Sequence, residues 1–140
     1  MGIPSLREGW GPHHLDLFLD KFEDNRASGI WFEEGMCDYL SRKLILTEEE
    51  FKAISEVEST LVTAFQSEYS HLTLDDFGTQ TYEGSLSSIM YQYWRSFLAI
   101  KHLVEEQFNH DIHQVFTTYH EWDKEGRSVS LTEYFGITTN

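Results

Sequence analysis

The stretch at 85–108 constrains the fold more than any other part of the chain. Its apolar residues recur at alternating intervals of four and three: Leu86, Met90, Tyr93, Phe97, Ile100, Val104 and Phe108. This spacing places them along one side of an α-helix. Four further apolar residues widen the stripe to well over a third of the circumference: Ile89, Trp94, Leu98 and Leu103. A helix this apolar must be covered on most sides. We therefore expect it to be the central helix of a helical core.

Two segments nearer the N-terminus also have helical spacing. Residues 12–25 place apolar side chains on one face and acidic ones on the other, which predicts an amphipathic helix. Residues 30–44 show a weaker pattern, because Gly35 lies in the middle and glycine disfavours helix interiors. We expect helices in both segments, preceded by an irregular arm at 1–11.

The next helix has a clear start signal. Thr47 followed by Glu50 forms a capping box, in which each side chain binds the other residue's backbone amide. From there the helical spacing runs over 48–69. The polar segment 70–84 is long for a connection in a small domain, and such loops often carry function. Ser85 then suits the N-cap of the central helix.

The helical spacing continues beyond the central stretch. One unbroken helix over 85–123 would be about 58 Å long at 1.5 Å per residue, which is too long for most domains of this size. We therefore predict a break or kink near Asn109, with Gly126 ending the last long helix. The tail at 128–140 packs on the bundle, either as a short helix capped by Ser130 or as a strand.

These segments predict an all-α fold, a single compact domain over 1–140 with about five or six helices. The chain has 140 residues, 40% of them hydrophobic, which suffices for a real core. No apolar run approaches the ~18 residues that a membrane span needs. The single Cys37 cannot form an internal disulfide, so we expect a cytoplasmic protein. Acidic neighbours should raise the pKa of this thiol, which disfavours a nucleophile.

Charge is the strongest global signal, with 24 acidic and 10 basic residues and a net charge of −14. Between residues 44 and 83 one base, Lys52, faces nine acids: Glu48, Glu49, Glu50, Glu56, Glu58, Glu68, Asp75, Asp76 and Glu83. A surface this acidic disfavours direct binding to nucleic acid or to an anionic membrane, and it favours a basic protein partner. The alternative is that the charge serves only solubility.

Aromatic residues lie among these acids and suggest a partner-binding surface. We expect it to comprise Glu48, Glu49, Glu56, Asp75, Asp76, Phe77, Tyr82 and Glu83. Carboxylates would steer the encounter with a basic partner, and an aromatic anchor would add affinity. The alternative left open is a solvated helix followed by an ordinary loop.

A second hypothesis concerns the end of the central helix, where four residues are spaced by four, four and three: His102, Glu106, His110 and His113. If the helix continued through Asn109, they would share one stripe, as in metal sites of helical bundles. A small metal-dependent enzyme is therefore the alternative function. The sequence has no phosphate-binding glycine loop and no nucleophile elbow, so we expect a non-enzymatic protein without a cofactor.

In general character the chain resembles the small acidic inhibitors that neutralise nucleases. These include the immunity proteins paired with bacterial toxins and the phage proteins that block nucleic-acid-binding defence complexes. The resemblance rests on size, charge, the lone cysteine and the absence of catalytic motifs, with no shared signature. It implies a protein that occludes the active site or nucleic-acid groove of a basic partner such as a toxin nuclease. The oligomeric state stays open.

Overall fold

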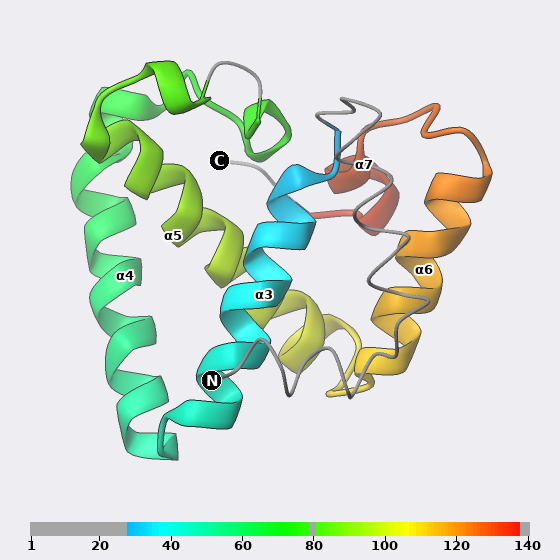
Figure 1. Cartoon of the computed structure of the whole chain (residues 1–140), viewed down its shortest axis with the longest axis horizontal. Helices are drawn as coiled ribbons and strands as arrows, with labels where there is room; N and C mark the ends of the chain where they lie inside the picture. The colour runs from blue at the N-terminus through cyan, green and yellow to red at the C-terminus, as the bar shows by residue number, and fades with distance from the viewer. Residues whose placement is uncertain (1–27, 79–80, 138–140) are drawn as a thin grey trace.

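The computed structural model describes residues 28–78 and 81–137, and the regular structure in these ranges is helical (Figure 1). The α-helices are α3 (Ile30–Ile45), α4 (Glu48–Tyr69), α5 (Leu86–His102), α6 (Ile112–Lys124) and α7 (Leu131–Phe135). Helices α3 and α5 run in one direction, and α4 and α6 run in the opposite direction (Figure 1). The all-α prediction is confirmed. The expected arm at 1–11 and helix at 12–25 lie outside the described residues.

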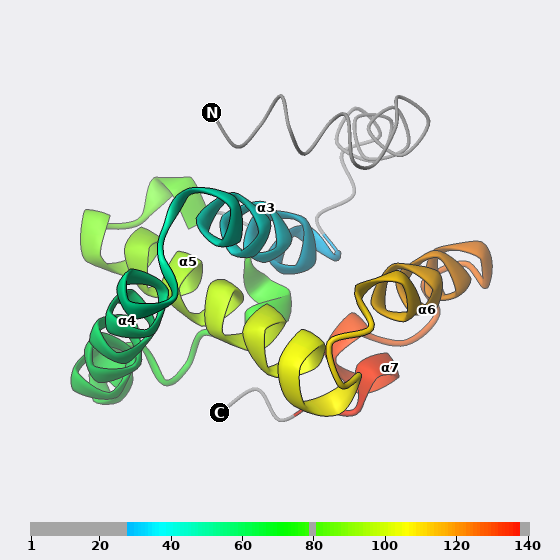
Figure 2. The same ribbon diagram turned by 90° about the horizontal axis from the view of Figure 1, so that it is seen from below.

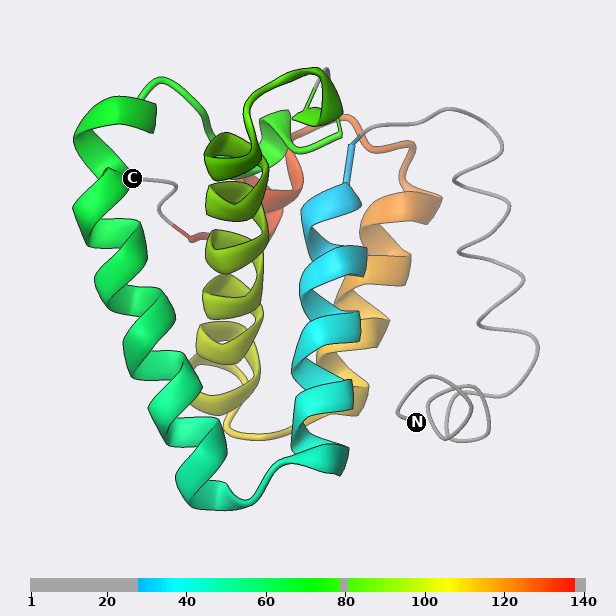
Figure 3. The same ribbon diagram turned by 60° about the vertical axis from the view of Figure 1, so that its left-hand side comes forward.

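Helix α5 packs against both α3 and α4 (Figure 3). Its side chains Phe97 and Ile100 are fully buried, as is Leu103 directly after its end. Its first two turns differ from the prediction, because Leu86 is 75% and Met90 37% exposed. The close contact of α3 with α5 at Gly35 lies further along the helix, beside Ser96 and Ile100. The buried part of α5 thus begins at Tyr91, about one and a half turns later than the periodicity suggests.

The crossing of α3 and α5 depends on Gly35. A Cβ atom at this position would overlap the Ser96 carbonyl oxygen and would lie 2.7 Å from Ile100 Cγ1. The two backbones therefore approach more closely than any larger residue allows. The glycine that weakened the helical pattern of this segment is the residue that lets it pack.

Helix α3 also carries the aromatic core. Trp31, Phe32 and Met36 have no exposed surface. The Phe32 ring stacks on Tyr119 of α6 at 4.2 Å and on Phe135 of α7 at 5.8 Å between centroids. Figure 2, viewed from below, shows α4 on one side of α5 and α6 with α7 on the other. Stacked rings of this kind join the two halves of the bundle.

The predicted break near Asn109 is confirmed. Helix α5 widens into a π-helical turn at Leu103–Gln107, and Asn109 and His110 then adopt positive φ angles of 54° and 69°. Asp111 begins α6 as its N-cap, and Gly126 follows its end with a φ of 91°. Two consecutive left-handed residues reverse the chain direction, which no continuous helix can do.

The predicted helix starts are confirmed as well. Thr47 and Glu50 form both bonds of the capping box, at 3.1 and 2.9 Å. Ser85 accepts a hydrogen bond from the Ser88 amide at the start of α5. The tail forms a short helix with Ser130 as its cap, the first of the two predicted alternatives. None of the helices within the described ranges is long and apolar enough to cross a membrane.

Candidate functional site

The structure divides the predicted partner-binding residues between the two ends of α4. Glu48, Glu49 and Glu56 lie on its N-terminal half, whereas the rest of the set follows its C-terminal end (Figure 1). Helix α4 has 22 residues and therefore spans about 33 Å at 1.5 Å per residue. The acidic segment, continuous in sequence, consequently does not form a single face.

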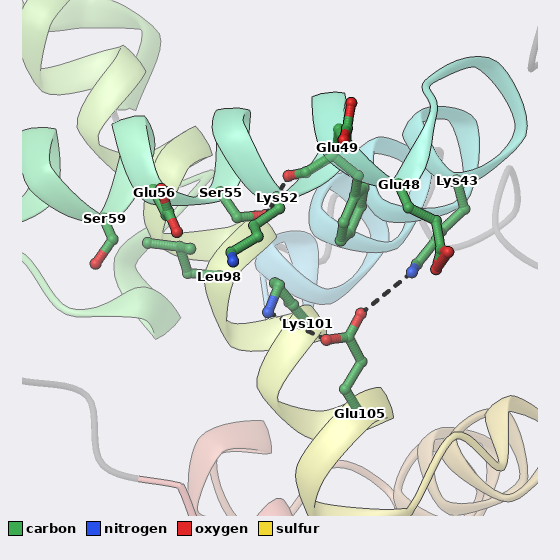
Figure 4. A pocket seen from close by; sticks show the side chains of 11 residues that line it. Lys43, Glu48, Glu49, Lys52, Ser55, Glu56, Ser59, Leu98, Lys101 and Glu105 are labelled. Carbon is green, nitrogen blue, oxygen red and sulfur yellow. Dashed lines mark hydrogen bonds and ion pairs between the residues drawn. The ribbon is translucent and has the colours of Figure 1, made fainter.

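The N-terminal group lines a pocket of about 710 Å³ between α4 and α5 (Figure 4). Its charged lining residues are Lys43, Glu48, Glu49, Lys52, Glu56, Lys101 and Glu105. Four carboxylates thus face three ammonium groups, which leaves a charge of −1. Lys43 and Lys101 both bind Glu105, at 3.5 and 3.1 Å. Lys43 and Lys101 therefore hold Glu105, and with Lys52 they leave the lining of this pocket nearly neutral.

Two residues of the C-terminal group serve the core instead of the surface. Phe77 is fully buried and packs edge-on against Tyr93 at 5.0 Å, so its prediction as a surface anchor is wrong. Asp75 accepts hydrogen bonds from Trp31 Nε1 at 3.3 Å and Thr132 Oγ1 at 2.5 Å. These contacts fasten the loop to α3 and α7 and leave this carboxylate little freedom to bind a partner.

Three residues of the predicted set remain exposed near the start of α5. Asp76 is exposed and accepts a hydrogen bond from the Thr73 amide at 2.9 Å. Tyr82 is 59% exposed, and its hydroxyl lies 2.7 Å from the Tyr93 hydroxyl. Glu83 is exposed beside it. An aromatic side chain held by one hydrogen bond and flanked by carboxylates is a typical interaction anchor.

Two carboxylates that the sequence did not single out, Glu34 and Asp38, lie one turn apart on α3. Both are half-buried, and burial raises the pKa of each. Repulsion from Asp38 raises the pKa of Glu34 further, and a hydrogen bond from Tyr93 partly offsets the rise. Burial, together with these acids, also raises the pKa of Cys37 to about 11, as expected. The four-residue spacing of Glu34 and Asp38 is the sequence signal that could have placed them on one face of a helix.

An ion pair joins α3 to α4 beside these acids. Arg42 donates to both oxygens of Glu58, at 3.1 and 2.9 Å, and its guanidinium lies 4.4 Å from the centre of the Phe97 ring. Glu58 is buried, so it does not contribute to the acidic surface counted from the sequence. The pair covers Phe97 and holds the two helices together.

We expect replacement of either partner of this pair to lower the free energy of unfolding by about 2 kcal/mol, because the other charge stays partly buried and unpaired. Arg42→Met and Glu58→Met should each show this loss in urea denaturation. The double variant should lose clearly less than the two single losses together. Strictly additive losses would contradict a direct interaction.

An apolar groove opens beside this pair, between the end of α3 and the start of α4. Its volume is about 500 Å³, and we call it the α3–α4 groove. It is lined by Ser41, Arg42, Ile45, Leu46, Glu50, Ala53, Ile54 and Val57. Ile45 and Val57 are 60% and 51% exposed, which is unusual for large aliphatic side chains. The helical spacing of the sequence does not indicate that these two side chains remain uncovered.

The residues of the metal hypothesis are not brought together. His102 Nδ1 lies 3.8 Å from Glu106 Oε1 on the exposed side of the helix end. The π-helical turn and the reversal at Asn109 then interrupt the stripe before His110 and His113. Within residues 28–78 and 81–137, no group of three or more His, Cys, Asp or Glu side chains could hold a metal ion.

One buried acid lies in the core, away from these surfaces. Glu33 accepts a hydrogen bond from the Tyr119 hydroxyl at 2.7 Å, and its second oxygen has no partner among the described residues. Burial raises the pKa of Glu33 to about 7. The folded protein therefore disfavours the charged form of this carboxyl.

No family model matches this chain. Neither a curated protein nor a solved structure matches it either.

The uncovered apolar side chains of the described residues form two groups, one where α3 ends and α4 begins and the other where α5 begins. Apart from Val129, the large exposed ones belong to the end of α3, to α4 and to the region where α5 begins: Leu44, Ile45, Val57, Tyr82, Leu86 and Met90. Clustered exposed apolar side chains with polar neighbours are characteristic of interaction sites. The group at the end of α3 and on α4, with Glu34 and Asp38 further along α3, is the candidate site.

Proposed function

We propose that this protein is a non-enzymatic, acidic binding protein that occludes a functional surface of a basic protein partner. One observation carries the proposal: exposed apolar side chains and acidic side chains occur together on α3, α4 and the start of α5. Residues 28–137 contain 19 Asp and Glu and 7 Lys and Arg, which leaves a net charge of −12. Charge steers the encounter, and apolar contact supplies most of the affinity.

The class of partner follows from the same charge balance. Most of the described basic side chains are engaged internally: Arg42 with Glu58, Lys43 and Lys101 with Glu105, and Arg127 with Asp123. The surface therefore offers carboxylates to a partner, as a nucleic acid offers phosphates. Proteins that bind nucleic acid have positive clefts of this complementary kind. A toxin nuclease or a nucleic-acid-binding defence complex is the partner we propose.

Capture at two salt concentrations tests this proposal. The immobilised chain is incubated with lysate of the source cells or of their competitors, and retained proteins are identified, purified and measured individually. We expect a partner with an isoelectric point above about 9. Its association rate constant should fall at least about tenfold between 50 and 500 mM NaCl, because salt screens the steering charges. If the partner is a nuclease, one equivalent of the chain should abolish cleavage.

Two results would contradict the proposal. One is a purified partner that is neutral or acidic. The other is an association rate constant that stays the same at both salt concentrations, since steering by −14 charge units must respond to screening.

A further inference from the structure

We propose that the α3–α4 groove is the docking site for an amphipathic, cationic helix of the partner. This inference rests on the proposed function and specifies where the partner binds and which of its segments does so. Carboxylates on α3 and α4 would receive its basic side chains, and the apolar walls of the groove would receive its apolar face.

The shape of the groove fits a helix. Its apolar walls come from two helices that meet at a tight turn, with Ile45 and Leu46 on one side and Ala53, Ile54 and Val57 on the other. Residues 53, 54 and 57 share one face of α4, as residues 41, 42 and 45 share one face of α3. Two converging helical faces form the usual receptor for the apolar side of a third helix.

The length of this surface sets the length of the docking segment. The same face of α3 continues from Ile45 through Arg42 and Asp38 to Glu34, a span of eleven residues or about 16 Å. Tyr93 links Glu34 to Tyr82, the exposed tyrosine at the far end. A partner helix of about three turns would reach from Ile45 in the groove to Glu34.

The charges along this surface require a cationic occupant. Glu50 lines the groove, and Asp38 and Glu34 follow along α3. Arg42, the cation in the lining of the groove, is bound on both nitrogens by Glu58.

Burial disfavours the charged forms of Glu34 and Asp38, as their raised pKa values indicate. Asp38 also repels Glu34, and the attraction of Arg42 offsets only part of the rise in the pKa of Asp38. A basic side chain placed between the two carboxylates would stabilise the charged form of each. The same charges make a second copy of this chain a poor occupant, because each copy has a net charge of −14.

The probe is a synthetic 18-residue peptide of leucine and lysine with helical amphipathic spacing. Two peptides serve as controls: the same design with glutamate in place of lysine, and a scrambled leucine–lysine sequence. Binding to the full chain is measured by titration and mapped by amide chemical shifts. We expect the amphipathic cationic peptide to perturb Asp38, Ile45 and Val57, and both controls to bind at least about tenfold more weakly.

Variants then test the two parts of the surface. Ile45→Ser/Val57→Ser should weaken binding of the cationic peptide at least about tenfold, chiefly by faster dissociation. Both side chains are more than half exposed, so the variant should keep its fold, which circular dichroism verifies. Glu34→Gln/Asp38→Asn should weaken binding about fivefold and reduce its salt dependence. The matched control is Glu106→Gln/Glu121→Gln, which removes two exposed charges elsewhere and should leave affinity within twofold.

The remaining outcomes each overturn the inference. Peptide shifts that map to α6 or α7 would mean that another surface binds cations, and the proposed function would stand. The absence of any peptide binding would reject the groove, and the capture experiment would decide the proposed function separately. A dimer in light scattering that Ile45→Ser/Val57→Ser dissociates would assign the groove to a second copy of the chain.

Discussion

Replacing Gly35 with valine should lower the free energy of unfolding by more than about 3 kcal/mol, enough to unfold a marginally stable domain. A Cβ atom there would overlap the Ser96 carbonyl oxygen and would lie 2.7 Å from Ile100 Cγ1. Ser96 and Ile100 are fully buried in α5, so neither can move aside without separating the two helices. Gly35→Ala should already destabilise markedly, although alanine favours helices over glycine.

Chemical denaturation followed by helical circular dichroism measures this loss. Gly126→Ala is the control, because nothing lies within 4 Å of its Cβ position and the only penalty is its positive φ. That penalty is about 1 kcal/mol. If Gly35→Ala were less destabilising than Gly126→Ala, the close crossing of α3 and α5 would be wrong.

We expect the free energy of unfolding to depend strongly on pH through Glu33. Burial raises the pKa of Glu33 from 4.5 to about 7, mainly because the low-polarity core disfavours its charge. The hydrogen bond from Tyr119 and the attraction of Arg127 act in the opposite direction, whereas Glu34 and Asp123 repel the charge. Protonated Glu33 is therefore the form that the folded state prefers.

A carboxyl whose pKa is higher in the folded state makes the protein less stable as pH rises. Below pH 4.5 the carboxyl is protonated in both states, and folding carries no ionisation penalty at this site. As pH rises through 7, the unfolded state has already released the proton, so the folded state loses about 3 kcal/mol of relative stability by pH 8. We expect this site to make the free energy of unfolding decrease between pH 5 and pH 8.

Glu33→Gln should remove most of this dependence, because an amide fills the same space and still accepts the Tyr119 hydrogen bond without ionising. The variant should be more stable than the natural chain at pH 8. Urea denaturation between pH 5 and pH 8 measures the slope, and Glu121→Gln, at an exposed position, should leave it unchanged. If Glu33→Gln keeps the original slope, the assignment to this carboxyl is wrong.

The helices and their ends could be predicted because their signals are local. The capping box at Thr47, the N-cap at Ser85 and the break near Asn109 each depend on a few neighbouring residues. The role of Gly35 could not be predicted in this way. Helix propensity counts its flexibility as a cost, whereas its benefit comes from α5, about sixty residues away in the sequence.

The candidate site was predicted only in part, for a related reason. Counting charge along the chain missed Lys101, which reaches the α4 pocket from another helix. It also treated Phe77 as an anchor, although the loop turns this ring into the core. Asp76, Tyr82 and Glu83 of the predicted set remain exposed near the start of α5, and the carboxylates of α3 were not in that set. Local patterns identify charged segments, but only tertiary packing decides which charges stay uncompensated.

The ion pair between Arg42 and Glu58 has a consequence for recognition. Its two hydrogen bonds fix the angle between α3 and α4, and they hold this angle before any partner arrives. The receptor is therefore preorganised, and little conformational entropy remains to be lost on association. The backbone beside Arg42 should differ by less than about 1 Å between the free and bound states. Selectivity would then come from which helices fit this fixed width, with no need for the receptor to reshape itself around each of them.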